Sequence, residues 1–141
     1  MKRATAIIFA IWFSNYCIGQ TESTKPIGLD TLFVTSKKKL LFEVNLDSSG
    51  HMFFSQVKKA SEAAKTVSIE VTYSDVLGTM LKIENPFNKQ MYYKAELYSY
   101  NKNDYVETST VPVGAKLSSF ETWPYKIDKM RLSGFILKEG E

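Results

Sequence analysis

The feature that most constrains the fold is a regular alternation of apolar and polar residues between Thr79 and Tyr100. Successive side chains of a β-strand point to opposite faces, so this alternation predicts strands with one buried and one exposed face. It is interrupted at Asn85-Pro86, a dipeptide typical of turns. The stretch therefore predicts a β-hairpin at the centre of an all-β domain.

The two faces of this predicted hairpin differ in character. The expected core face holds Leu81, Ile83, Met91, Tyr93, Ala95 and Leu97, and the expected outer face holds Met80, Lys82, Glu84, Tyr92, Lys94, Glu96 and Tyr98. Burying a large apolar side chain contributes roughly 1.5–3 kcal/mol, so the first set decides which face turns inward.

Further strands are predicted on both sides of this stretch, each bounded by turn residues. They cover residues 31–36, 40–46, 67–73, 105–113 and 127–138. In the second of them, Leu40, Phe42, Val44 and Leu46 are expected to face the core. Gly134 is expected to form a bulge or bend in the last strand.

Two segments carry weaker strand patterns. Residues 51–66 start with apolar residues, and Phe53, Val57, Ala60 and Ala64 then follow helical spacing. We expect two or three extended residues there, followed by a short helix ending near Lys65. Residues 118–125 contain Pro124 and are expected to be an aromatic connection.

About seven short strands, with at most one short helix, predict an immunoglobulin-like antiparallel β-sandwich, with a small β-barrel as the alternative. The Cys–Trp–Cys arrangement of antibody domains is not present, so the likeness is architectural. We expect one sandwich domain over residues 31–141, preceded by a flexible lead over residues 20–30.

Residues 1–19 have the layout of a secretory signal peptide. Lys2 and Arg3 precede a short apolar run over residues 5–13, and a small-x-small site ends at Gly19. The run is about half of the roughly 20 residues that a membrane-spanning helix needs. We therefore expect export to a periplasm or to the extracellular space, with no membrane span.

Cys17 is the only cysteine of the 141 residues and lies inside this predicted signal. Lipidation at Cys17 is the alternative to cleavage, but the residues before it, Ser14 and Tyr16, do not suit a lipid-attachment site. The exported domain is thus expected to fold without disulfides. Losing the signal would lower the net charge from +3 to about +1, which argues against nucleic acid as a partner.

A sequence resemblance supports the same fold. The strand ending in Asn85-Pro86, followed by Met91-Tyr92-Tyr93-Lys94-Ala95, is similar to a motif of water-stress and late-embryogenesis-abundant-type sandwich domains. The chain also looks like small exported bacterial proteins with immunoglobulin-like folds. The resemblance covers about twenty residues and implies a sandwich, and it transfers no functional residue.

Catalytic and metal-binding patterns are weak. His51 is the only histidine, and Ser48, Ser49 and Ser55 near it are residues that turns commonly contain. Glu84 and Glu96 could face each other on neighbouring strands as a hydrolase pair, although Lys82 and Lys94 favour ion pairs instead. A copper site of His51, Met52, Met80, Met91 and Met130 is a further alternative, with core packing the simpler explanation of Met91 and Met130. No cofactor is expected.

The excess of aromatic residues is the strongest indication of function. Tyr92, Tyr98, Tyr100, Tyr105 and Trp123 are the candidate binding residues, because tyrosine and tryptophan are enriched in recognition surfaces. Cross-strand packing is the structural alternative for the tyrosines, and a plug at one end of the sandwich is the alternative for Trp123. We expect a non-catalytic binding or accessory module for a protein or carbohydrate partner.

Overall fold

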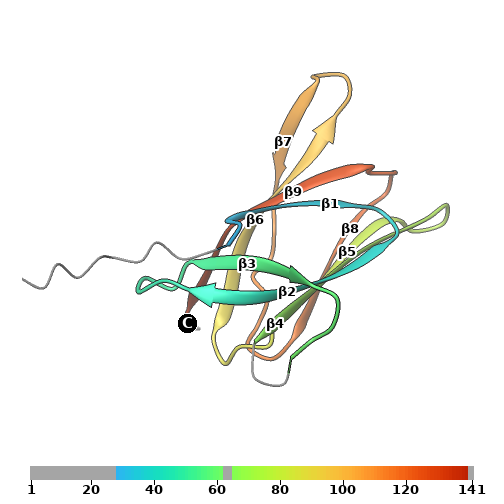
Figure 1. Ribbon diagram of the computed structural model, residues 1–141. Coiled ribbons are helices and arrows are strands. Elements are labelled where there is room, and N and C mark those ends of the chain that lie inside the picture. The colour runs from blue at the N-terminus through green and yellow to red at the C-terminus, as the bar shows by residue number, and fades with distance from the viewer. Residues whose placement is uncertain (1–27, 62–64, 140–141) are drawn as a thin grey trace, which may run out of the picture.

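The computed structural model describes residues 28–61 and 65–139 (Figure 1). The predicted signal peptide, Cys17 and most of the predicted lead lie outside these residues. The strands are β1 (Thr31–Thr35), β2 (Lys38–Leu46), β3 (Met52–Val57), β4 (Thr66–Ser74), β5 (Gly78–Glu84), β6 (Gln90–Ser99), β7 (Asp104–Thr108), β8 (Ser118–Trp123) and β9 (Lys129–Lys138). No helix occurs in the described residues, so none there could span a membrane.

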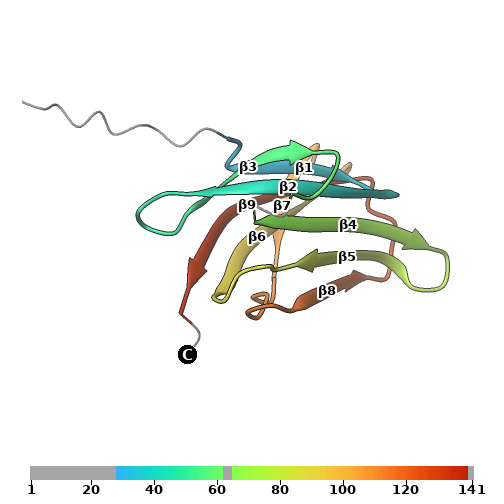
Figure 2. The same ribbon diagram turned by 60° about the horizontal axis from the view of Figure 1, so that its bottom comes forward.

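The strands form two antiparallel sheets that pack face to face (Figures 1 and 2). One sheet has the order β1-β9-β6-β7 and the other has the order β3-β2-β4-β5-β8. Neither sheet closes on itself, so the predicted antiparallel sandwich is confirmed and the alternative of a small barrel is wrong.

The core lies between the two sheets, where apolar side chains from alternate positions of each strand meet. Most of the predicted core residues are buried, namely Phe42, Leu81, Ile83, Met91, Tyr93 and Ala95, while Leu40, Val44 and Leu97 are partly buried. Leu46 is exposed instead, because it is the last residue of β2 and lies at the end of the sheet. Period-two patterning therefore identified the inward face of each strand, except at this strand end.

The predicted hairpin over residues 79–100 is wrong in its pairing. β5 pairs with β4 and β8, whereas β6 pairs with β7 and β9 in the other sheet. Both strands turn an apolar face inward. Two strands show this same alternation whether they pair in one sheet or face each other from opposite sheets, so the pattern does not identify the partner. The residues between them cross from sheet to sheet.

Asn85 shapes this crossing. Its buried side-chain amide donates hydrogen bonds to the carbonyl oxygens of Lys89, Val113 and Gly114, at 2.8, 3.1 and 3.0 Å. Its side-chain oxygen accepts a hydrogen bond from the backbone N–H of Phe87 at 2.9 Å. The Phe87 N–H and the Lys89 carbonyl have no strand partner, and the carbonyls of Val113 and Gly114 gain a second hydrogen bond, which is why a polar residue is buried at this turn.

β3 and β8 are the two strands that the sequence patterns did not predict in full. The helix expected after residue 53 is wrong for residues 54–61, while Ala64 lies outside the described part of the chain. Phe54 is buried between Phe42 and Phe135, at ring-centroid distances of 5.8 and 4.7 Å, and this packing outweighs local helix propensity. Residues 118–123, expected to be a connection, pair along β5 as an edge strand.

Gly134 forms the predicted bulge in β9. Tyr92 pairs with Ile136 and Lys94 with Ser133, so two residues of β9 oppose Tyr93 alone. The φ angle of Gly134 is +62°, a conformation that favours glycine. The bulge turns Phe135 into the core, where its ring stacks on that of Tyr93 at 5.6 Å.

Candidate functional site

Four aromatic side chains form a contiguous cluster on the outer face of the β1-β9-β6-β7 sheet. The ring of Tyr98 packs edge-to-face against those of Tyr100 and Tyr105, at centroid distances of 5.0 and 5.3 Å. Tyr105 in turn contacts Phe33 of β1 at 6.2 Å. Phe33 and Tyr100 are 65% and 64% exposed, so the two ends of the cluster are open to solvent.

Two cations lie over the middle of this cluster. The ammonium of Lys129 is 5.0 Å from the ring centroid of Tyr98, and the guanidinium of Arg131 is 4.7 Å from that of Tyr105. Arg131 also donates two hydrogen bonds to the carboxylate of Glu96, at 2.6 and 2.5 Å, and this contact holds the pKa of Glu96 below its usual value. We call Phe33, Tyr98, Tyr100, Tyr105, Lys129 and Arg131 the tyrosine face.

The register of the sheet explains why these residues meet. Tyr98 lies opposite Tyr105 on the neighbouring strand, and Phe33 lies opposite Arg131. Phe33 and Arg131 point outward because both of their neighbours along the strand are core residues, and Tyr98 and Tyr105 lie on the same face as each other because they are directly paired. All four strands of this sheet thus contribute to one surface.

The aromatic segment over residues 118–125 does not lie over the tyrosine face as a layer. Its residues 118–123 form β8 of the opposite sheet, and Tyr125 beyond them lines a shallow pocket with Leu97 and Tyr98. The β6–β7 hairpin projects beyond the sandwich, so Tyr98, Tyr100 and Tyr105 lie on a projecting element (Figure 1).

The two remaining candidates lie elsewhere. Tyr92 is further along β6, where its hydroxyl donates to Gln90 at 2.9 Å and the ammonium of Lys138 lies 5.3 Å from its ring. Trp123 is only 8% exposed, and its indole N–H lies 3.4 Å from the Thr108 hydroxyl of the other sheet. This burial fits the alternative in which Trp123 fills one end of the sandwich.

The structure separates the carboxylates that a hydrolase would have needed. Glu84 lies in β5 and Glu96 in β6, which belong to different sheets, so the two do not face each other. Glu84 pairs with Lys82 of its own strand, and this hydrogen bond lowers the pKa of Glu84. A general acid needs a raised pKa, and in both residues the pKa is shifted the other way.

His51 belongs to a turn rather than to a catalytic triad. The Ser49 hydroxyl donates to the Asp47 carboxylate at 2.7 Å, and the same hydroxyl lies 2.7 Å from Nδ1 of His51. Because the Ser49 O–H points at Asp47, the serine oxygen can only accept from the imidazole, and a hydrogen bond between them requires the ring proton to be on Nδ1. The backbone N–H groups of Ser49 and His51 also bond to Asp47, and together these contacts lower the pKa of the Asp47 carboxyl and close the β2–β3 turn.

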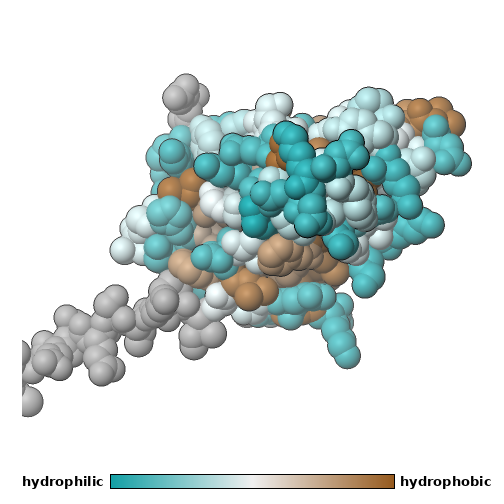
Figure 3. Space-filling model, turned by 90° about the horizontal axis from the view of Figure 1, so that it is seen from above, coloured by the Kyte–Doolittle hydropathy of each residue, from teal (hydrophilic) through white to brown (hydrophobic). Residues whose placement is uncertain are grey.

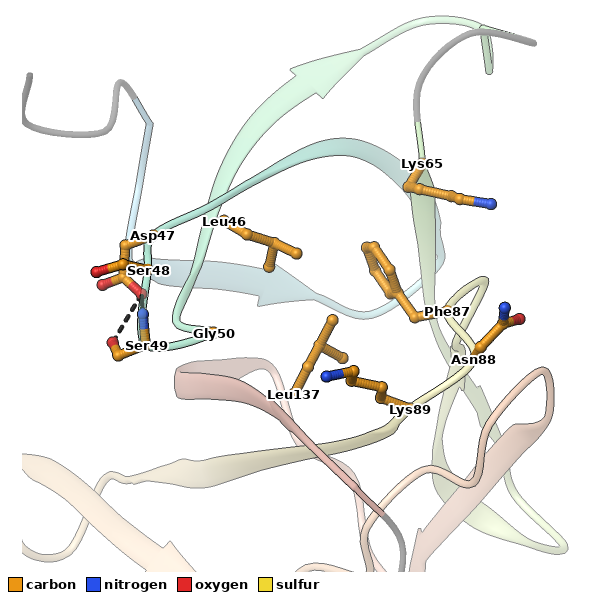
Figure 4. Close-up of a pocket in the computed structure, with 10 residues that line it drawn as sticks. All are labelled: Leu46, Asp47, Ser48, Ser49, Gly50, Lys65, Phe87, Asn88, Lys89 and Leu137. Carbon is orange, nitrogen blue, oxygen red and sulfur yellow. Dashed lines mark hydrogen bonds between the residues drawn. The ribbon is translucent and has the colours of Figure 1, made fainter.

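A pocket of about 470 Å³ lies beside this turn (Figure 4). Leu46, Phe87 and Leu137 converge on it as an apolar wall. Lys65 and Lys89 lie at its rim, and the ammonium of Lys89 is 2.6 Å from the Glu139 carboxylate. With Asp47 and Ser49 bonded to each other, the pocket has an apolar wall and cations but no activated nucleophile.

The methionines considered for copper are mainly core residues. Met52, Met91 and Met130 are buried among apolar side chains, and Met80 is half-buried in β5. Among the described residues, no group of three or more histidine, cysteine, aspartate or glutamate side chains lies close enough together to hold a metal ion.

Comparison with protein families, with curated proteins and with solved structures finds no match to this chain. The function is therefore argued from the surface itself.

Sequence reasoning missed Phe33, Lys129 and Arg131 as members of this surface. The signal for Phe33 was present, since Leu32 and Val34 on either side of it are apolar and buried, which places Phe33 on the outer face. Its contact with Tyr105 was not accessible, because it depends on β1 and β6 both pairing with β9.

Proposed function

We propose that the protein is an exported, non-catalytic binding module that recognises a partner protein through the tyrosine face. The observation that carries this proposal is the cluster of four aromatic rings, from three strands, on an outer sheet surface. Tyrosine and arginine are enriched at the energetic centres of protein interfaces, and both are present here in direct contact. Export rests on the signal-like pattern of residues 1–19.

The packing of the rings favours a protein over a carbohydrate. Sugar recognition uses flat ring faces that are free to stack, whereas here cations lie over Tyr98 and Tyr105. The tyrosines also meet edge-to-face rather than as a flat platform. Rings held by their neighbours lose little conformational entropy on binding, which suits an anchor for a shaped protein surface.

The test compares the capture of partner proteins by the wild-type protein and by a Phe33→Ser/Tyr100→Ser variant. Both side chains are exposed, so the variant should keep its fold, which circular dichroism and thermal melting would check. Removing two anchors of an interface centre should weaken a specific partner by about tenfold or more. Quantitative mass spectrometry of captured proteins, followed by titration of the enriched partner, measures this.

Phe120→Ser is the matched control. Phe120 is also exposed, with the ammonium of Lys82 lying 5.9 Å from its ring centroid, but it is on the other sheet. This control should capture the same partner as the wild-type protein. Equal capture by the wild type and by Phe33→Ser/Tyr100→Ser would contradict the proposal, as would binding of oligosaccharides alone on a glycan array.

A further inference from the structure

The β4–β5 ribbon extends beyond the strands on both sides of it. β2 begins at Lys38 opposite Val71, and β8 ends at Trp123 opposite Thr79. Residues 72–74 therefore extend beyond β2, and over residues 74–78 the ribbon has no paired strand on either side. In Figures 1 and 2 the turn of this ribbon is the outermost point of that end of the sandwich.

Two aliphatic side chains occupy the tip of this ribbon. Val76 is 91% exposed and Leu77 is 68% exposed. Figure 3 shows hydrophobic atoms at the extremity of the molecule that corresponds to this turn in Figure 1. Single exposed apolar residues are common on protein surfaces, but two adjacent ones at the most protruding point form a small apolar knob.

The knob is held in one conformation. The Ser74 hydroxyl accepts a hydrogen bond from the backbone N–H of Leu77 at 3.0 Å, and the Tyr73 hydroxyl donates to Asp75 at 3.0 Å. Behind it, the backbone of Gly78 packs so closely on β8 that a Cβ there would lie 2.1 Å from the carbonyl oxygen of Trp123. The tip therefore need not be ordered on binding, which removes a cost that flexible loops incur.

Cationic side chains lie behind the knob, at the same end of the sandwich. Lys37 is in the β1–β2 turn, Lys38 begins β2, and Lys126 is in the β8–β9 connection; the turn and the connection flank the β4–β5 ribbon (Figures 1 and 2). Lys126 is paired with Asp128 at 3.0 Å. Asp75, in the tip itself, also has no oppositely charged side chain at ion-pair distance. Within the described part of the chain, Lys37 and Lys38 have no carboxylate at ion-pair distance, so two lysines and one carboxylate leave this end with a net charge of about +1.

We propose that this end of the sandwich docks on an anionic lipid bilayer. Val76 and Leu77 enter the boundary between headgroups and acyl chains, and Lys37 and Lys38 lie against the phosphates. An apolar tip with cations set behind it matches the layers of a bilayer surface, where apolar groups go deepest and lysines remain with the headgroups. The Tyr73 ring, amphipathic and next to the tip, suits the interface between them.

The shape of this end favours a bilayer over a pocket in another protein. A pocket would take up the convex tip alone and leave the lysines of the flanking turn without a role. A flat anionic surface contacts the tip and the turn together. The contact is local and the protein has little net charge, so binding should be weak, reversible and sensitive to salt.

The test is sedimentation of the purified protein with vesicles of phosphatidylcholine, with and without added phosphatidylglycerol. The N-terminal residue of the purified protein is determined first, because an uncleaved apolar segment at residues 5–13 would bind vesicles on its own. We expect wild-type protein to bind the anionic vesicles. Val76→Ser/Leu77→Ser should reduce the partition coefficient by about tenfold.

Two further variants separate the parts of the proposal. Val111→Ser/Leu117→Ser removes two aliphatic side chains that are each 62% exposed but lie outside the β4–β5 ribbon, and it should bind within about twofold of the wild type. Lys37→Gln/Lys38→Gln should lower binding to anionic vesicles toward the level on neutral ones.

Three results would overturn the proposal. They are the absence of vesicle binding by the wild type, equal binding by Val76→Ser/Leu77→Ser, and an equal loss in the Val111→Ser/Leu117→Ser control. The Phe33→Ser/Tyr100→Ser variant should bind vesicles normally, since those residues are on the outer face of the other sheet. This last comparison keeps the bilayer proposal independent of the partner proposed for the tyrosine face.

Discussion

At the scale of single residues, Asn85 has the largest structural role for a polar side chain. It is buried, and its amide bonds to backbone groups in both the β5–β6 crossing and the segment that follows β7. Its neighbour in the same loop, Asn88, is exposed. The two asparagines thus provide a matched pair for measuring what the buried amide contributes.

Asn85→Ala should destabilise the protein by about 3 kcal/mol, because the backbone N–H of Phe87 and the carbonyl of Lys89 would lose their hydrogen-bond partner and the carbonyls of Val113 and Gly114 would each lose one of two. Asn88→Ala should change the free energy of unfolding by less than about 0.5 kcal/mol. Urea unfolding followed by tryptophan fluorescence measures both. Equal midpoints for the two variants would show that water replaces the amide of Asn85 at no cost.

The same scale shows how far sequence patterns reach for the candidate site. Alternation placed Tyr98 on an outer face, and the structure agrees. It could not show that Trp123 is buried, because burial of an aromatic residue at a strand end depends on what packs over it. Nor could it bring Phe33 to Tyr105, a contact between residues 72 positions apart that the sheet order alone creates.

At the scale of elements, strands were easier to predict than their partners. The seven predicted strands all exist, with shifted ends, because each buries alternate apolar residues. β8 was not predicted because its sequence, SSFETW, is largely polar. An edge strand that buries little of its surface needs few apolar residues. The β5–β6 hairpin was wrong for a different reason, since alternation is the same for strands that pair and for strands that cross the core.

Gly78 controls the approach of β5 to the end of β8. Its φ angle is +76°, and a Cβ would lie 2.1 Å from the carbonyl oxygen of Trp123, which is backbone and cannot move aside. Gly78→Ala should therefore destabilise the protein by about 2 kcal/mol or more.

Gly114→Ala is the matched control for this substitution. Its Cβ would lie 2.8 Å from Cδ1 of Leu117, the far end of an exposed and flexible side chain, and Gly114 has no positive φ. We expect a change within about 1 kcal/mol, measured by the same urea unfolding. A larger loss for Gly114→Ala than for Gly78→Ala would contradict the assignment of the close contact.

At the scale of the whole molecule, its ionised carboxylates predict instability in acid. The pKa values of Asp47, Glu84 and Glu96 are all lowered, chiefly by hydrogen bonds from Ser49, Lys82 and Arg131 respectively. Unfolding releases these carboxylates to their ordinary, higher pKa values, so the unfolded chain binds more protons. The stabilisation is present above the ordinary carboxyl pKa and is lost as pH falls through the lowered values.

Glu96→Gln isolates one of these contributions. The variant should be less stable than the wild type near about pH 7 and should lose less stability between about pH 5 and pH 3, because glutamine does not titrate. Glu43→Gln, in β2 of the other sheet, is the control and should follow the wild-type profile, because it removes a carboxylate that is in no ion pair of the described residues and is not adjacent to Glu96. Urea midpoints across this range measure the effect, and parallel profiles for Glu96→Gln and the wild type would rule it out.

The position of β9 also governs when the molecule can assemble. Among the described residues β9 is the last strand in sequence, yet it lies between β1 and β6 and is the strand that pairs with β1. While the ribosome is still making residues 129–138, β1 has no partner and the core is open on one side. The sandwich can therefore close only after residues 129–138 have been synthesised, so its folding cannot be completed strand by strand during translation.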